Sequence, residues 1–84
     1  MSRNEIIEKL KVILATVKGI ELSDIDCDEN TNLMTELGLN SIGMLYMVIS
    51  IENQLNIRFA DANMDELDTV GKVIDYIEKV QKSL

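Results

Sequence analysis

The chain has 84 residues, of which 46% are hydrophobic, and eight basic and fifteen acidic side chains give it a net charge of −7. A chain of this length buries only about 60–65% of the surface that its unfolded form exposes, which leaves room for a modest core but not for a large catalytic cavity. Histidine is absent, which removes the commonest general base and metal ligand. We therefore expect a single domain over residues 1–84, with no catalytic residues and no metal site.

The acidic residues are concentrated in the middle of the chain. Residues 19–68 contain eleven acids and one base, Arg58, whereas the two ends together contain seven bases and four acids. Such a middle segment repels nucleic acid phosphates and attracts basic protein surfaces. The lone cysteine, Cys27, cannot form an internal disulfide, and no apolar run reaches the roughly 20 residues that a membrane span needs. We expect a cytoplasmic monomer that binds no nucleic acid.

The first helix is predicted over Arg3–Val17. Ser2 followed by Glu5 fits a capping box, and Gly19 can end the helix in a left-handed conformation. One apolar stripe recurs at the helical period: Ile6, Ile7, Leu10, Ile13, Leu14 and Val17.

A long connection follows over about residues 18–40. Connections of this length are uncommon in compact domains and tend to be functional or disordered. Spaced apolar residues predict an ordered loop anchored to a helical core: Ile20, Leu22, Ile25, Leu33, Met34, Leu37 and Leu39.

The second helix is predicted over Ser41–Leu55, with Asn40 as its N-cap. A turn and a short helix near Ala62–Leu67 come next, and the last helix spans Thr69 to about Lys82, capped by Asp68. No segment alternates with period two, so we expect no sheet. The fold class is all-α: a four-helix bundle of three main helices and one short helix, with a long loop between the first two.

The second helix has two apolar faces. At 100° per residue one side is predicted to lie in the core: Met44, Val48, Ile51 and Leu55. The opposite side carries Ile42, Tyr46, Ile49 and Asn53, where a surface helix would be polar. We interpret this second side as a docking surface, and the alternative is that it packs against the long connection.

Ser41 lies in the first turn of the second helix. Backbone N–H groups at this position lack intrahelical partners and the helix dipole is positive, so a phosphate on the serine would be stabilised. Gly38 supplies a tight turn into the helix, and Leu39 and Ile42 can place apolar surface beside an attached group. On these features alone Ser41 can equally be an ordinary residue at the start of a helix.

The chain resembles the acyl carrier protein family over nearly its whole length. The family has a helix, a long loop and then Gly-x-Asp-Ser-Leu opening the second helix, where this chain has Gly38-Leu39-Asn40-Ser41-Ile42. The segment TVGKVIDYIEKV, residues 69–80, is similar to the family's final helix. The resemblance implies that Ser41 receives 4′-phosphopantetheine from coenzyme A through a transferase. The terminal thiol of that arm then holds an acyl or aminoacyl group as a thioester.

The resemblance also implies roles for the neighbouring residues and partners. Gly38, Leu39, Asn40 and Ile42 would shape the site for the phosphopantetheinyl transferase, and the other partners would be acyl-loading and condensing enzymes. The chain departs from the family at Asn40, where Asp is usual. It departs again on the exposed face of the second helix, where Gly43 and Tyr46 replace acids.

These departures favour a specialised carrier in a polyketide, nonribosomal peptide or related pathway over a housekeeping fatty acid role. The predicted partner surface is Ile42, Gly43, Tyr46 and Ile49. Steering by charge could come from the acidic loop: Asp24, Asp26, Asp28, Glu29 and Glu36.

Further hypotheses concern the loop and the cargo. Asp24, Asp26 and Asp28 alternate like an EF-hand, but Glu29 and Thr35 occupy the positions that need Gly and Glu, so we do not expect a calcium site. The core faces of the three main helices, with the short helix, would form a cleft for cargo, gated by the short helix. The alternative function is an unmodified helical interaction module.

Overall fold

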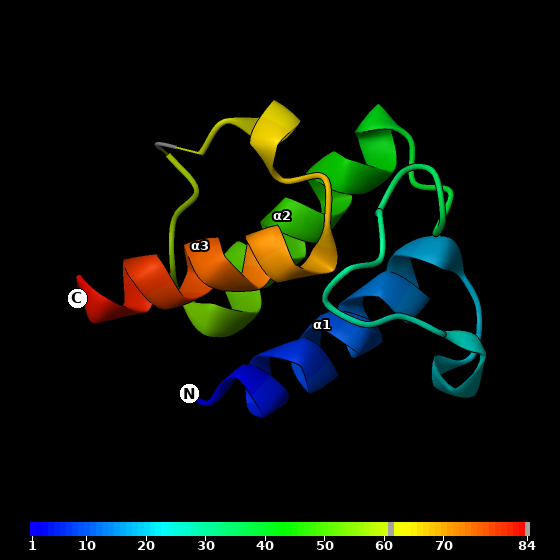
Figure 1. The fold of residues 1–84 in the computed structure, drawn as a ribbon, viewed down its shortest axis with the longest axis horizontal. Helices are drawn as coiled ribbons and strands as arrows, with labels where there is room; N and C mark the ends of the chain where they lie inside the picture. The colour runs from blue at the N-terminus through cyan, green and yellow to red at the C-terminus, as the bar shows by residue number, and fades with distance from the viewer. Residues whose placement is uncertain (61, 84) are drawn as a thin grey trace.

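The computed structural model describes residues 1–60 and 62–83 (Figure 1). In chain order the elements are α1 (Arg3–Lys18), the 3-10 helix η1 (Leu22–Asp24), α2 (Ser41–Leu55), the 3-10 helix η2 (Met64–Glu66) and α3 (Val70–Lys82). The described residues form no strand, and their one β-bridge pairs Asn32 with Thr69. The all-α prediction is therefore confirmed, although the fourth helix is only a single turn.

Local capping signals define α1. The Ser2 hydroxyl accepts the N–H of Glu5 at 3.2 Å, and the Glu5 carboxylate accepts the N–H of Ser2 at 3.2 Å, which completes the predicted capping box. At the other end Gly19 has φ of 70°, and its N–H donates to the carbonyl groups of the last turn. The helix ends at Lys18, one residue later than predicted.

The predicted bounds of α2 are confirmed. Asn40 precedes the helix in an extended conformation and caps it, and Asn56 ends it in a left-handed conformation with φ of 55°. Met44, Val48 and Ile51 are buried as predicted, and Met47 is fully buried beside them.

The segment before α3 differs from the prediction in two ways. The short helix expected over Ala62–Leu67 is the single 3-10 turn η2, and α3 is capped by Thr69, not by Asp68. The Thr69 hydroxyl accepts the N–H of Lys72 at 3.3 Å, whereas the Asp68 carboxylate forms an ion pair with the Lys72 ammonium at 2.9 Å. The bridge with Asn32 in the long loop holds Thr69 extended, so that the helix begins at Val70, one residue later than predicted.

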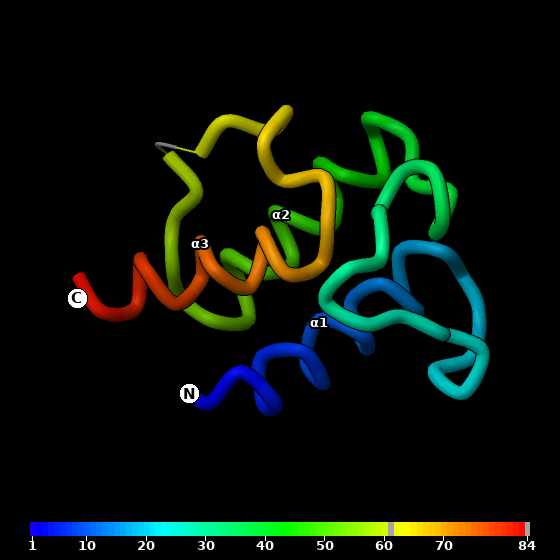
Figure 2. The backbone as a smooth tube through the Cα atoms, in the orientation of Figure 1, coloured from blue at the N-terminus to red at the C-terminus, as the bar shows by residue number. Residues whose placement is uncertain are grey.

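That pairing also explains why the long connection is ordered. Leu33 N–H donates to Asp68 O at 2.8 Å, and Val70 N–H donates to Thr31 O at 3.0 Å. In Figure 2 the loop between α1 and α2 passes beside the segment that enters α3. Four of the predicted anchors are buried in the core: Ile25, Leu33, Leu37 and Leu39. The other three, Ile20, Leu22 and Met34, are exposed, so their prediction as anchors was wrong.

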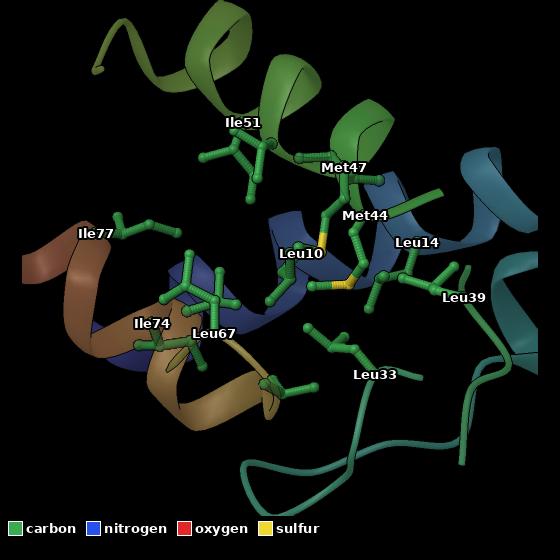
Figure 3. Close-up of a cluster of buried hydrophobic side chains, with 14 of the residues drawn as sticks. Leu10, Leu14, Leu33, Leu39, Met44, Met47, Ile51, Leu67, Ile74 and Ile77 are labelled. Atoms are coloured by element: carbon green, nitrogen blue, oxygen red, sulfur yellow. The ribbon is translucent and has the colours of Figure 1, made fainter. Parts of the chain in front are cut away.

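The core lies where the three helices and the loop meet (Figure 3). Leu10 and Leu14 of α1, Met47 and Ile51 of α2, and Ile74 of α3 are at most 1% exposed. Helix α1 contacts both other helices, and it runs antiparallel to α2. The C-terminal end of α1 and the start of α2 therefore lie at the same end of the molecule. No helix within the described residues is long and apolar enough to cross a bilayer.

Candidate functional site at the start of α2

A tight turn delivers the chain to the start of α2. Gly38 has φ of 74°, a left-handed conformation that a residue with a side chain rarely adopts. On either side of this glycine the backbone is fixed. The Lys18 ammonium donates to Leu37 O at 2.5 Å, and the N–H of Leu39 donates to Leu33 O at 3.0 Å. The position of the following residues is thus set by α1 and by the buried part of the loop.

Asn40 organises the first turn of α2. Its side-chain oxygen accepts the N–H of Gly43 at 2.8 Å, and its backbone oxygen accepts the N–H of Met44 at 2.9 Å. The N–H groups of Ser41 and Ile42 belong to the turn that has no intrahelical acceptors. These two N–H groups and the positive end of the helix dipole favour an anion at Ser41.

Ser41 is exposed and lies beside a groove of about 380 Å³. The groove is lined by the loop, by α2 and by η2: Met34, Ser41, Met44, Leu45, Met64 and Asp65. This differs from the predicted cleft, which was to lie between the core faces of the three main helices. Fully buried side chains such as Leu14, Met47 and Ile51 occupy that space instead. The short helix was expected to border the cargo cleft, and its residues Met64 and Asp65 line this groove. The loop residue Met34 was missed because only the tertiary fold brings it to Ser41.

The outward side of α2 is apolar. Ile42 is 62% exposed, Tyr46 59% and Ile49 42%, so the loop does not cover the predicted docking surface. Leu45, at 54%, belongs to the same surface and was missed, although its position one turn after Ile42 could have indicated it.

Two predicted site residues lie inside the structure and not on its surface. Gly43 is buried, so its placement on the exposed face was wrong. A Cβ on Gly43 would lie 3.3 Å from Leu39 Cδ2, and Leu39 itself is only 6% exposed. Leu39 therefore supports the start of α2 from beneath and lines no surface at Ser41.

The acidic loop has its own internal structure. The Asp28 carboxylate accepts the N–H of Asn30 at 2.8 Å, and Asp28 O accepts the N–H of Thr31 at 3.2 Å. No group of three metal-ligating side chains occurs within residues 1–60 and 62–83. Cys27 is half-buried, and this burial raises the pKa of its thiol above the ordinary value.

The site has the features that a phosphodiester-linked arm requires. An exposed hydroxyl lies at a helix start beside N–H groups that have no helical acceptor, and an apolar groove opens next to it. Residues 8–77 match the family model described as Phosphopantetheine attachment site.

Comparison with individual proteins also finds similarity to carrier proteins. An acyl carrier protein of Thermotoga maritima is 32% identical over 78 residues, which cover 93% of this chain and 94% of that protein. An acyl carrier protein of Akkermansia muciniphila is 32% identical over 81 residues, covering 96% and 99%. A solution structure of the apo doublet acyl carrier protein from prodigiosin biosynthesis superposes with a TM-score of 0.70 at 18% identity. It is matched over 94% of this chain and 38% of its own.

The fold and the site thus define a carrier protein, a small helical domain that bears a prosthetic arm. The chain belongs to the acyl carrier protein family. It bears covalently attached 4′-phosphopantetheine and carries acyl groups in fatty acid or secondary-metabolite biosynthesis.

Proposed function

We propose that Ser41 is the residue to which the arm is attached. Residues 8–77 contain three serines. Ser50 is half-buried in the middle of α2, where the backbone N–H groups are used by the helix, and Ser23 lies in the three-residue η1. Ser41 alone of the three combines an exposed hydroxyl with a long helix's first turn. This combination is the observation that carries the proposal.

The residues around Ser41 would hold and present the arm. When bound, 4′-phosphopantetheine supplies the thiol on which the acyl group is held as a thioester. The N–H groups of Ser41 and Ile42 would face the phosphate, and the side chains of Met34, Leu45 and Met64 would offer apolar surface to the part of the arm that follows. Methionine suits a surface that receives more than one cargo, because its flexible thioether adapts to irregular shapes.

The chain itself would catalyse no step of the pathway. It has no histidine, and the thiol that carries the cargo comes from the arm and not from Cys27. The transferase, loading and condensing enzymes would bring the bases and nucleophiles, while this domain presents the cargo to each of them in turn.

Partner enzymes would bind the outward side of α2 through Ile42, Leu45, Tyr46 and Ile49. The one acid of this helix, Glu52, is held by the backbone because its carboxylate accepts the N–H of Phe59 at 2.9 Å. Recognition here would rest on apolar burial and not on charge. Such a surface fits a specialised polyketide, nonribosomal peptide or related pathway. It fits less well a pathway whose enzymes recognise the carrier through basic patches. We include in this proposal that the cargo is an acyl or an aminoacyl group.

The η2 turn would act as the gate of the groove. Met64 is 38% exposed, Leu67 is the one buried residue at its end, and the turn is closed by the N–H of Glu66 on Asn63 O at 2.9 Å. Few buried contacts imply a low free energy of local opening. Hydrogen exchange of the η2 amides should be much faster than that of the α2 interior, and equal protection of the two elements would contradict the gate.

Intact mass measurement tests the attachment. The chain is incubated with coenzyme A and a broad-specificity phosphopantetheinyl transferase, and a mass gain of one phosphopantetheine is expected. Ser41→Ala should abolish the gain, while Ser50→Ala should retain it. A gain that survives in Ser41→Ala assigns the arm to another residue. Full function of Ser41→Ala in the pathway would favour the alternative of an unmodified interaction module.

Loss of loading could also reflect a mismatch between this carrier and the chosen transferase. Asn40→Asp restores the residue usual in the family and separates the two cases. If Asn40→Asp is loaded and the native chain is not, the transferase reads position 40. If neither is loaded at any enzyme concentration, Ser41 is not the attachment site.

A further inference from the structure

The orientation of the Asn40 side chain at Ser41 is fixed. Its oxygen is the acceptor for the N–H of Gly43 at 2.8 Å, and an amide nitrogen could not take that place because it only donates. The Nδ2 group therefore points away from Gly43 N–H. An aspartate could make the same cap with one carboxylate oxygen, but its full negative charge would then stand one residue before Ser41.

The start of α2 has few negative charges of its own. The first turn contains no acid, and the first acid along the helix is Glu52, eleven residues after Ser41. Across the groove one carboxylate, that of Asp65, comes from η2. The Lys18 ammonium is bound to Leu37 O at 2.5 Å, four residues before Ser41. A carboxylate at position 40 would thus add a negative charge in the residue directly before Ser41.

We propose that Asn40 is a positioning residue that keeps the cap neutral, so that a phosphodiester on Ser41 stabilises α2 instead of being repelled. The inference rests on the proposed attachment at Ser41. With Asn40 the new negative charge interacts favourably with the dipole and with the N–H groups of the first turn, and no carboxylate in the adjoining residue opposes it. In an Asn40→Asp protein the same charge would meet a like charge in the neighbouring residue, and the two effects would largely cancel. Modification should consequently raise the melting temperature of the native carrier more than that of the Asn40→Asp variant.

A thermodynamic cycle measures this coupling. The melting temperatures of apo and loaded protein are compared for the native chain and for Asn40→Asp, with loading verified by intact mass. The rise on loading should be smaller in Asn40→Asp by about 2–6 °C at low ionic strength. The difference should shrink at about 0.5 M salt, because the two charges are exposed and screened. The amide resonance of Gly43 reports whether the cap is kept in the variant.

Asn53→Asp is the matched control. It adds the same charge to the same helix at an exposed site twelve residues from Ser41, which is about 18 Å along the axis and beyond the screening length at physiological salt. Its rise on loading should equal that of the native chain. Equal rises in the native chain and Asn40→Asp, with the cap intact, would overturn the inference. Absence of any mass gain in both proteins would instead count against the attachment at Ser41.

Discussion

The backbone N–H of Gly71 donates to Glu29 O at 2.8 Å, and a Cβ on Gly71 would lie 2.8 Å from the same oxygen. Gly71 is in the first turn of α3, and Glu29 is in the loop between α1 and α2. This close approach joins the long loop to the third helix, next to the pairs that Leu33 and Val70 form with the backbone. The loop that positions Ser41 is thus anchored at a glycine that lies thirty residues beyond Ser41 in the sequence.

Gly71→Ala should destabilise the fold. In an exposed helix position this change would add about 1 kcal/mol of stability, but here the methyl group meets a backbone carbonyl that cannot move without breaking the loop pairing. We expect a net loss of about 1–2 kcal/mol in the free energy of unfolding, measured from the urea midpoint at unchanged slope.

Gly43→Ala is the control for this substitution. Its Cβ would approach the Leu39 side chain at 3.3 Å, and a side chain can shift where a backbone carbonyl cannot. The loss in Gly43→Ala should therefore be the smaller of the two. A Gly71→Ala protein as stable as the native chain would show that the loop is free to retreat from α3.

The helix boundaries could be predicted because their signals are local. Ser2 with Glu5, Gly19 and Asn40 act within one turn of the helix that they start or end, and all four do so in the structure. The cap of α3 could not be predicted in this way. Asp68 and Thr69 are both good caps, and the choice between them depends on the pairing of residues 68–70 with a loop thirty-five residues earlier.

The candidate site was predictable to a similar degree. Ser41 and Asn40 follow from the motif, and the exposure of Ile42 and Tyr46 follows from the helical period. The periodicity could not reveal that Gly43 is buried against Leu39, because this contact depends on how the loop turns back before the helix. Nor could it place η2 beside Ser41, since the two are brought together by packing against the shared core.

Arg3 should be important for stability at low salt. Its guanidinium contacts Glu29 of the loop and both Asp75 and Glu78 of α3, with a distance of 2.8 Å to Asp75. The contact with Glu29 contributes most to raising the pKa of Arg3 above its ordinary value. Arg3→Ala leaves three carboxylates facing one another, so the melting temperature should fall, and the fall should be reduced at about 0.5 M salt.

Two further variants distinguish the ion pairs of Arg3 from an effect of net charge. Lys9→Ala removes one positive charge from the same helix at an exposed position, and it should cost less. Arg3→Lys keeps the charge but not the planar fork that reaches several carboxylates, and it should recover part of the loss. If Lys9→Ala and Arg3→Ala lower the melting temperature equally, net charge and not this network is responsible.

The capping box of α1 should give a pH-dependent contribution to stability. The N–H of Ser2, followed by its hydroxyl, holds the pKa of Glu5 below its ordinary value of 4.5. Since the folded state favours the ionised form, this contribution is complete above the ordinary pKa and is lost as the pH falls through the lower folded-state pKa.

Glu5→Gln isolates this effect because the amide can still accept from Ser2 N–H but does not titrate in this range. The native chain should melt at a higher temperature than Glu5→Gln at about pH 6, and the difference should shrink as the pH falls below the ordinary pKa and through the lower folded-state pKa. A difference that stays constant from about pH 6 to about pH 3 would mean that the charge of Glu5 adds nothing to the cap.

Tyr46→Ser should weaken recognition by the phosphopantetheinyl transferase without weakening the fold. Tyr46 is 59% exposed on the apolar side of α2, so its removal costs little folding free energy, but a buried aromatic anchor in an interface commonly contributes more than about 1 kcal/mol. We expect the KM for the carrier to rise by about tenfold with kcat unchanged. Gln54→Ser, an exposed change farther along the helix and away from this side, should leave KM unaltered.

Because the surface between Ile42 and Ile49 carries no formal charge, KM for the native chain should change little between about 50 and about 500 mM salt. A steep rise of KM with salt, together with a normal KM for Tyr46→Ser, would assign recognition to the acidic loop instead.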